Sequence, residues 1–418
     1  MKKCIRWMSL AAVVFAAAGV LWGCGSGAGR EASATMAAQP PPAANTYAAK
    51  AAETMAAMED GSMPQDGEGS PMVAHNTEEY RYNPENPFMA VSGAPLSTFG
   101  ADVDTASYAN IRRMLLGGSP VPEDAVRIEE MLNYFYYDYP EPKEHEPFSV
   151  TTRLAECPWN QSHSLLQIGL QAKKLDEDTL PASNLVFLLD VSGSMDAPDK
   201  LDLVKRAFLT MTENLKDGDS ISIVTYASSD KVVLDGASGS DRTRIMTAIE
   251  NLEAGGSTAG SKGIKTAYEL AEKHFIKGGN NRVILATDGD LNVGVTSEGG
   301  LTRLIQKKRK SGVFLSVLGF GTGNIKDNKM EALADNGNGQ YAYIDSMAEA
   351  RKVLVEEMGG TLFTVAKDVK FQVEFNPAKV KGYRLIGYEN RVMADQDFDD
   401  DTKDGGEIGA GHRVTALY

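Results

Sequence analysis

The sequence contains little cysteine, little histidine and no excess of positive charge. Three cysteines in 418 residues are too few for a disulfide-stapled scaffold, and the five histidines lack the spacing of a metal site. The 42 Lys and Arg residues stand against 57 Asp and Glu residues, and the resulting net charge of −15 argues against nucleic acid or an anionic membrane surface as the main partner. A hydrophobic content of 42% excludes a wholly disordered chain, and the length predicts two or three domains of roughly 150 residues each.

The apolar stretch at the N-terminus is too short for a permanent transmembrane helix. Residues 8–22 follow a basic start but fall short of the ~20 residues that span a bilayer, which predicts a signal peptide over residues 1–23; a short membrane anchor is the alternative. Its end, Leu-Trp-Gly-Cys24, resembles the lipobox of bacterial lipoproteins, although Trp22 departs from the small residue usual there. The resemblance implies a lipidated Cys24 and attachment to the cell envelope. Because Gly25 is not the Asp associated with inner-membrane retention, the outer membrane is expected if the source has two membranes.

Composition divides the rest of the chain into a tether and an ordered part. Residues 24–78 are rich in Ala, Met, Gly, Pro and Ser and bury no periodic apolar face, which predicts a disordered tether. With Cys4 in the signal and Cys24 lipidated, Cys157 stands alone, and a buried inert thiol is favoured over a catalytic one.

Residues 79–147 predict a helical flanking region. Thr105 or Asp104 can cap a helix that ends at Gly117 and Gly118, and Pro122 opens a second helix that reaches Phe135. Within residues 148–180, two stretches with alternating apolar side chains, 148–155 and 165–171, predict strands of a flanking β domain.

Residues 181–360 alternate between strand and helix patterns. Continuous apolar runs typical of strands buried on both faces include residues 184–190 and 282–287, and a short strand at 231–234 is expected at an edge. The further predicted strands are 221–226, 313–318 and 340–344, and the predicted helices are 201–215, 242–252, 261–274, from about 300, 326–334 and 347–358. This alternation predicts an α/β fold, a doubly wound and mostly parallel sheet with helices on both faces.

Period-2 patterns return in residues 361–418, a C-terminal β-rich flanking region. Strands are predicted at 369–375, 383–388 and 414–418, and we expect them to build one small β-sandwich with the two strands before residue 180. The acidic run 395–404 fails the EF-hand template, since Thr402 stands where Gly belongs, so a solvated acidic loop is favoured there over a calcium site.

Oxygen-bearing side chains follow three of these elements. Asp190, Ser192 and Ser194 come directly after the first buried strand, Thr258 lies in the Gly255-Gly256-Ser257-Thr258 loop, and Asp288 follows the strand 282–287. Ligands of doubly wound sheets bind beyond the carboxyl ends of the strands. Such an all-oxygen set suits Mg²⁺ first, then Mn²⁺ or Ca²⁺, and does not suit zinc. Capping of the next turn by Asp190 and Ser194 is the alternative.

At these residues the sequence resembles the metal-ion-dependent adhesion site of a von Willebrand factor type A (VWFA) domain. DVSGSM, GGST and ATDG match its D-x-S-x-S, T, D pattern in order, and the resemblance implies that Ser192, Ser194 and Thr258 contact the ion directly. Segments on both sides, including residues 95–108, 127–135 and 409–418, resemble a family of bacterial lipoproteins that carry one such domain between characteristic flanking regions. Members continue past the equivalent of Tyr418, so the chain is expected to be truncated.

The favoured function is a membrane-anchored adhesion module that is not an enzyme. Hydroxyl ligands are neutral, so the ion keeps positive charge with which it can bind an acidic group of a protein partner. The alternative is a structural envelope protein whose metal only stabilises the fold, and a metal- or thiol-dependent hydrolase comes last. Neither a phosphate-binding loop nor a G-x-S-x-G elbow is present, because Ser261 stands where the loop needs Lys and no such elbow surrounds Ser192 or Ser257.

Overall fold

The computed structural model describes residues 76–101, 104–143, 145–176, 180–256, 261–289, 298–357, 363–400, 403 and 405–418. The predicted signal, most of the predicted tether, Cys24 and Thr258 lie outside these residues. Within the described ranges, no helix combines the length and the apolar character needed to cross a bilayer.

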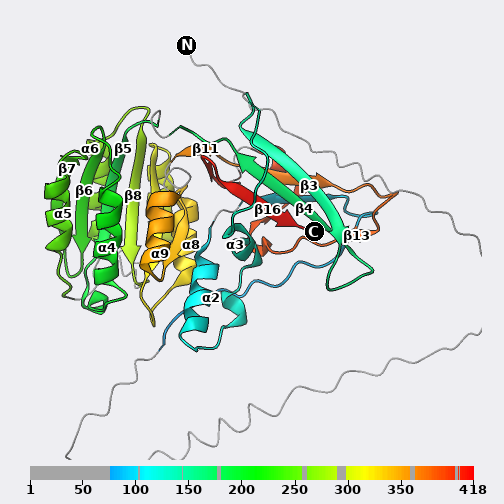
Figure 1. The fold of residues 1–418 in the computed structure, drawn as a ribbon, viewed down its shortest axis with the longest axis horizontal. Coiled ribbons are helices and arrows are strands. Elements are labelled where there is room, and N and C mark those ends of the chain that lie inside the picture. Colours follow the sequence, from blue (N-terminus) through cyan, green and yellow to red (C-terminus); the bar gives the residue numbers. More distant parts are fainter. Residues whose placement is uncertain are drawn as a thin grey trace, which may run out of the picture. The chain divides into compact units, whose positions relative to one another are not determined.

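A six-stranded sheet forms the centre of residues 183–344 (Figure 1). The strand order is β10-β9-β8-β5-β6-β7, and every neighbouring pair is parallel except β6 and β7. The strands are β5 (Ser183–Asp190), β6 (Ser220–Tyr226), β7 (Asp230–Ser238), β8 (Asn280–Thr287), β9 (Val313–Phe320) and β10 (Tyr341–Ile344). The predicted mostly parallel sheet is confirmed, and the strand expected at an edge is the edge strand β7, which is longer than the pattern indicated.

Helices cover both faces because successive strand residues point to opposite sides. Phe187 and Ile223 belong to an apolar cluster with α4, α5 and α9, whereas Val186 and Val224 belong to another with α6, α7 and α8. The helices are α4 (Leu201–Thr212), α5 (Arg242–Glu250), α6 (Ser261–Lys273), α7 (Glu298–Arg309), α8 (Asp327–Asn336) and α9 (Met347–Arg351). The doubly wound prediction is therefore confirmed. The last predicted helix, 347–358, differs in detail, since α9 continues as a π-helical segment, η4 (Lys352–Glu356).

The flanking segments form two three-stranded antiparallel sheets that share one apolar core. One sheet has the order β16-β4-β3, and the other has the order β12-β2-β14. Their strands are β2 (Leu96–Gly100), β3 (Phe148–Glu156), β4 (Ser164–Ala172), β12 (Lys370–Glu374), β14 (Val392–Met393) and β16 (Arg413–Leu417). Phe99 of one sheet and Leu170 and Val414 of the other lie in the same buried cluster, as the predicted sandwich requires. Two-stranded pairs join β1 (Met89–Ala90) to β13 (Gly382–Tyr383) and β11 (Thr364–Ala366) to β15 (Ile408–Gly409).

Three predictions in the flanks are wrong in part. The region 79–147 is not helical alone, because β2 lies at the centre of a sheet with strands about 270 residues away in sequence. The helix expected from Pro122 to Phe135 is two short pieces, η1 (Glu123–Ala125) and α3 (Ile128–Asn133), with extended backbone at Arg127. The strand 383–388 ends early, since Gly387 and Tyr388 both have positive φ.

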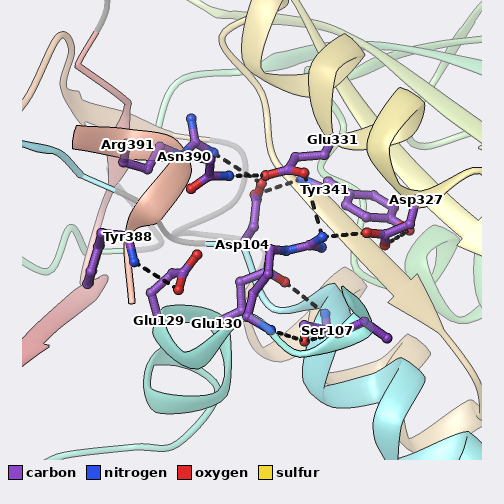
Figure 2. Close-up of polar contacts among 12 residues, drawn as sticks. Asp104, Ser107, Glu129, Glu130, Asp327, Glu331, Tyr341, Tyr388, Asn390 and Arg391 are labelled. Atoms are coloured by element: carbon purple, nitrogen blue, oxygen red, sulfur yellow. Dashed lines mark hydrogen bonds and ion pairs between the residues drawn. The ribbon is translucent and has the colours of Figure 1, made fainter. Parts of the chain in front are cut away.

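The break before α3 brings Arg127 into a buried ionic cluster. Its guanidinium pairs with Glu130 of α3 and Asp327 of α8, and Glu331 lies 3.6 Å away. Tyr341 of β10 donates a hydrogen bond of 2.9 Å to Asp327. Figure 2 shows the acidic residues of this cluster at the junction between the N-terminal flank and the α/β unit. Since Arg127 is only 4% exposed, its charge depends on these carboxylates.

Asp104 belongs to the same junction and does not cap α2 (Ala106–Leu116). Thr105 holds the N-cap position without a side-chain hydrogen bond, and Asp104 accepts a hydrogen bond from the backbone N–H of Tyr341 instead (2.9 Å). The Asp104 carboxylate also lies 3.7 Å from Arg391 in η5 (Glu389–Arg391) of the C-terminal flank (Figure 2). The N-terminal flank is thus joined to the α/β unit by buried charges, and Arg391 of the C-terminal flank pairs with Asp335 of α8 (2.9 Å).

Substitution R127M is expected to lower the free energy of unfolding by about 3–5 kcal/mol, because it leaves buried carboxylates without their cation. Denaturant unfolding of the full chain measures this loss. The matched control is R206M on the exposed face of α4, for which a change within about 0.5 kcal/mol is expected. Equal losses in the two variants would contradict the assigned role of the cluster.

Candidate metal centre

Two carboxylates lie together because β5 and β8 are parallel neighbours. Leu189 of β5 pairs with Ala286 of β8, so Asp190, the last residue of β5, and Asp288, the residue directly after β8, lie at the same edge of the sheet. Both are fully buried, at 0% and 1% exposure. The convergence predicted for these two residues is present.

The two serines lie on a tight turn directly after Asp190. The backbone N–H of Ser192 donates to Asp190 Oδ1 (2.9 Å), and the turn continues as η3 (Gly193–Met195). The Ser192 and Ser194 hydroxyls are 3.0 Å apart. Met195 at the end of η3 is buried in the apolar cluster with Phe187 and Ile223, and this burial holds the turn against the core. The structure therefore brings Asp190, Ser192 and Ser194 together at one end of β5.

The loop that precedes Thr258 lies against this turn. Gly193 donates its N–H to the Gly256 carbonyl (2.9 Å), and Gly255 donates to the Val191 carbonyl (2.8 Å). Gly256 has φ +80° and a Cβ there would meet the Ser228 hydroxyl at 2.5 Å, so this close approach requires glycine. Thr258 itself is outside the described residues, and its place in the set remains a prediction.

Among the described residues, no cationic side chain contacts Asp190 directly. Its hydrogen-bond donors are the Ser192 N–H and the Thr287 hydroxyl, the latter at 3.2 Å from Oδ2. Burial raises the pKa of Asp190 to about 6, although the hydrogen bonds lower it. The negative charge of Asp288 also raises this pKa. A buried carboxylate held only by neutral donors is unfavourable. A divalent cation beside the two serine hydroxyls would compensate it, so the residues fit a metal of the kind that oxygen donors prefer.

Asp288 differs, because Lys200 contacts it. The Lys200 ammonium lies 2.8 Å from Asp288 Oδ2, and the lysine is itself only 9% exposed. Sequence reasoning missed this residue. The available signal was its position at the start of α4, where a positive charge is disfavoured by the helix dipole unless something compensates it.

The residues considered for other chemistries lie elsewhere or do not cluster. Cys157 is a buried free thiol in the flank, and its contact with His163 is a backbone hydrogen bond. In the described part of the chain no group of three or more His, Cys, Asp or Glu side chains has the geometry to hold a metal. The candidate centre has only two carboxylates among its described residues, so it depends on serine hydroxyls for its remaining oxygen donors there.

Family models match three parts of the chain. The model described as von Willebrand factor type A domain matches residues 184–357. Models described as von Willebrand factor and as the C-terminal part of "Uncharacterized protein YfbK" match residues 74–167 and 360–418.

Individual proteins are similar over different lengths. "Uncharacterized protein YfbK" of Escherichia coli (strain K12) is 46% identical over 349 residues, which cover 82% of this chain and 61% of that protein. The chain thus spans less than two thirds of the length of that relative. A solved von Willebrand factor type A structure from Catenulispora acidiphila is 17% identical, with a TM-score of 0.42, and the match covers 65% of this chain and 64% of that one. Proximal thread matrix protein 1 from the mussel byssus, with a zinc-occupied MIDAS motif, is 23% identical with a TM-score of 0.34, over 42% of this chain and 45% of that one.

The sheet order, the converging loops and the family-model match agree on one identification. Residues 184–357 of this chain form a von Willebrand factor type A domain.

Proposed function

We propose that this domain binds a divalent cation through Asp190, Ser192, Ser194, Thr258 and Asp288, and uses it to engage an acidic group of a protein partner. The observation that carries the proposal is the buried Asp190 carboxylate, whose donors within the described ranges are all neutral and which lies at the base of the turn with both serine hydroxyls. Von Willebrand factor type A domains generally mediate protein–protein interactions, which supports a binding role over an enzymatic one.

Mg²⁺ is the favoured ion, with Mn²⁺ or Ca²⁺ as alternatives. When bound, the ion supplies a positively charged position to which a partner carboxylate can bind. Because the chain contributes neutral hydroxyls as well as two carboxylates, the ion keeps more of its positive charge than it would in an all-carboxylate site.

A groove next to the candidate centre offers a surface for the rest of the partner. It has a volume of about 800 Å³, and Val191, the residue after Asp190, is one of its lining residues. Lys231 of β7 and Arg244 of α5 are among its lining residues. Asp241 and Glu253 line it as well, so the groove offers charged side chains of both signs to a partner segment.

Attachment to the cell envelope is part of the proposal and is supported by the sequence alone. The lipobox-like segment ending at Cys24 and the acidic, Pro- and Ser-containing stretch after it suit a lipid anchor with a tether. In a bacterium with two membranes the outer membrane is the favoured site.

The first test compares D190N with the wild-type full chain in chelator and in Mg²⁺. Because burial raises the pKa of Asp190, the folded wild type binds a proton more tightly than the unfolded chain and loses stability as pH rises from about 4 to about 7. In chelator at about pH 7, D190N should therefore be more stable than the wild type by about 2–3 kcal/mol. The difference should vanish below about pH 4.

Magnesium should reverse this order, since it compensates the charge that D190N lacks. Thermal unfolding with and without Mg²⁺ measures the reversal, with the exposed D217N as the matched control. A wild type that gains no stability from Mg²⁺, Mn²⁺ or Ca²⁺ would contradict the metal centre.

The second test addresses the partner. Ser194 is exposed, so S194A should fold normally and weaken metal binding by about tenfold through the loss of one oxygen donor. Envelope proteins captured by the full chain in Mg²⁺ should be lost in chelator and reduced with S194A, but retained with the exposed flank variant S162A. Capture that is equal in all four conditions would favour a structural role for the metal.

A further inference from the structure

The contact between Lys200 and Asp288 places a fixed positive charge beside one of the two candidate carboxylate ligands. The ammonium lies 2.8 Å from Asp288 Oδ2, and both residues are buried. Asp190, the other carboxylate, instead receives hydrogen bonds from the Ser192 N–H and the Thr287 hydroxyl. The two acidic side chains are therefore compensated unequally.

The position of Lys200 is determined by three elements of the fold. Its N–H donates to the Ala197 carbonyl (3.0 Å), and its own carbonyl accepts from Val204 in the first turn of α4 (2.9 Å). Its aliphatic stem crosses Gly321 after β9, where an added Cβ would overlap the stem. Gly321 has φ +75° and its carbonyl accepts a hydrogen bond of 2.6 Å from Tyr343 of β10. The lysine is therefore held in a built position and is not a mobile surface cation.

The charge of Lys200 changes the net charge of the metal centre. Two carboxylates and a dication sum to zero, whereas the same group with Lys200 carries one net positive charge. An anion approaching the ion is then attracted more strongly, because the site has low exposure to screening water. The dication itself is held less tightly, because the nearby like charge repels it.

We propose that Lys200 is a specificity-determining residue of the metal centre. It neutralises Asp288, so that the bound dication keeps net charge for an anionic group of the partner, at the cost of weaker metal binding. This inference rests on the proposed function, because it requires a dication at Asp190, Ser192 and Ser194. A purely structural role, as the counterion that allows Asp288 to be buried, predicts a different result.

The test measures two affinities on the full chain, with Mn²⁺ as the metal and acetate as the carboxylate probe. Calorimetry gives the Mn²⁺ dissociation constant. Enhancement of water-proton relaxation by bound Mn²⁺ gives the acetate affinity, since acetate displaces water from the ion. The variants are K200M, which removes the charge, K200R, which keeps it, and K205M, a lysine on the same helix whose ammonium contacts the Glu250 carbonyl (3.1 Å).

K200M is expected to bind Mn²⁺ about tenfold more tightly and acetate on the Mn²⁺ form about tenfold more weakly than the wild type. K200R and K205M should stay within about threefold of the wild type in both measurements. Opposite changes in the two affinities cannot come from general destabilisation, which would weaken both. Unchanged or weaker Mn²⁺ binding by K200M overturns the proposal.

Folding is controlled separately. Saturating Mn²⁺ should support folding of K200M, because the dication can replace the lost charge beside Asp288; K200Q serves the same comparison if K200M does not fold. If neither neutral variant folds in Mn²⁺, Lys200 is a structural counterion and the proposal is wrong. If the wild type binds no Mn²⁺, the metal centre itself is wrong. If the wild type binds Mn²⁺ and K200M does not bind it more tightly, only the role of Lys200 is wrong.

Discussion

The parallel pairing of β5 with β8 is the constraint on which the candidate centre depends. It brings Asp190 and Asp288 to one sheet edge, from positions 98 residues apart, and both are buried there. Burying two like charges side by side is unfavourable unless positive charge compensates them. Lys200 compensates Asp288, while Asp190 has neutral donors beside two serine hydroxyls. This asymmetry connects the fold to the proposed chemistry, since it leaves a negatively charged position with oxygen donors at the carboxyl ends of β5 and β8.

The flanks are integrated with the α/β unit and are not independent appendages. Arg127 and Asp104 of the N-terminal flank are tied by charge or hydrogen bonds to α8, β10 and Arg391. The first described residues also contact the unit, because Thr77 and Glu79 donate backbone hydrogen bonds to Gly323 and Ile325. That loop follows β9 and includes Gly321, which packs against Lys200. The segments that accompany the domain therefore extend to the loops around the candidate centre.

The sequence allowed prediction of the elements whose signals are local. Runs such as residues 184–190 and 282–287 are apolar on both faces, and the oxygen-bearing residues follow them directly, so the sheet and the convergence of Asp190 with Asp288 could both be predicted. The contacts made by Lys200 and Arg127 could not, because each depends on a partner about 90 to 200 residues away. The strand β2 was missed for the same reason, since it precedes the α/β unit in the sequence whereas its partners β12 and β14 follow that unit. Asp104 looked like a helix cap because local spacing cannot reveal that Tyr341 competes for its carboxylate.

Crystals of the full chain soaked with Mn²⁺ give the most direct measurement of the central claim. An anomalous difference map should contain a peak at the Asp190, Ser192 and Ser194 turn, within about 2.0–2.3 Å of the serine hydroxyls, as expected for oxygen ligands of small divalent ions. The bound ion should have at least one coordination position filled by water or by a carboxylate that does not belong to the chain. A well-ordered turn without any anomalous peak, or a peak enclosed on all sides by protein ligands, would contradict the account.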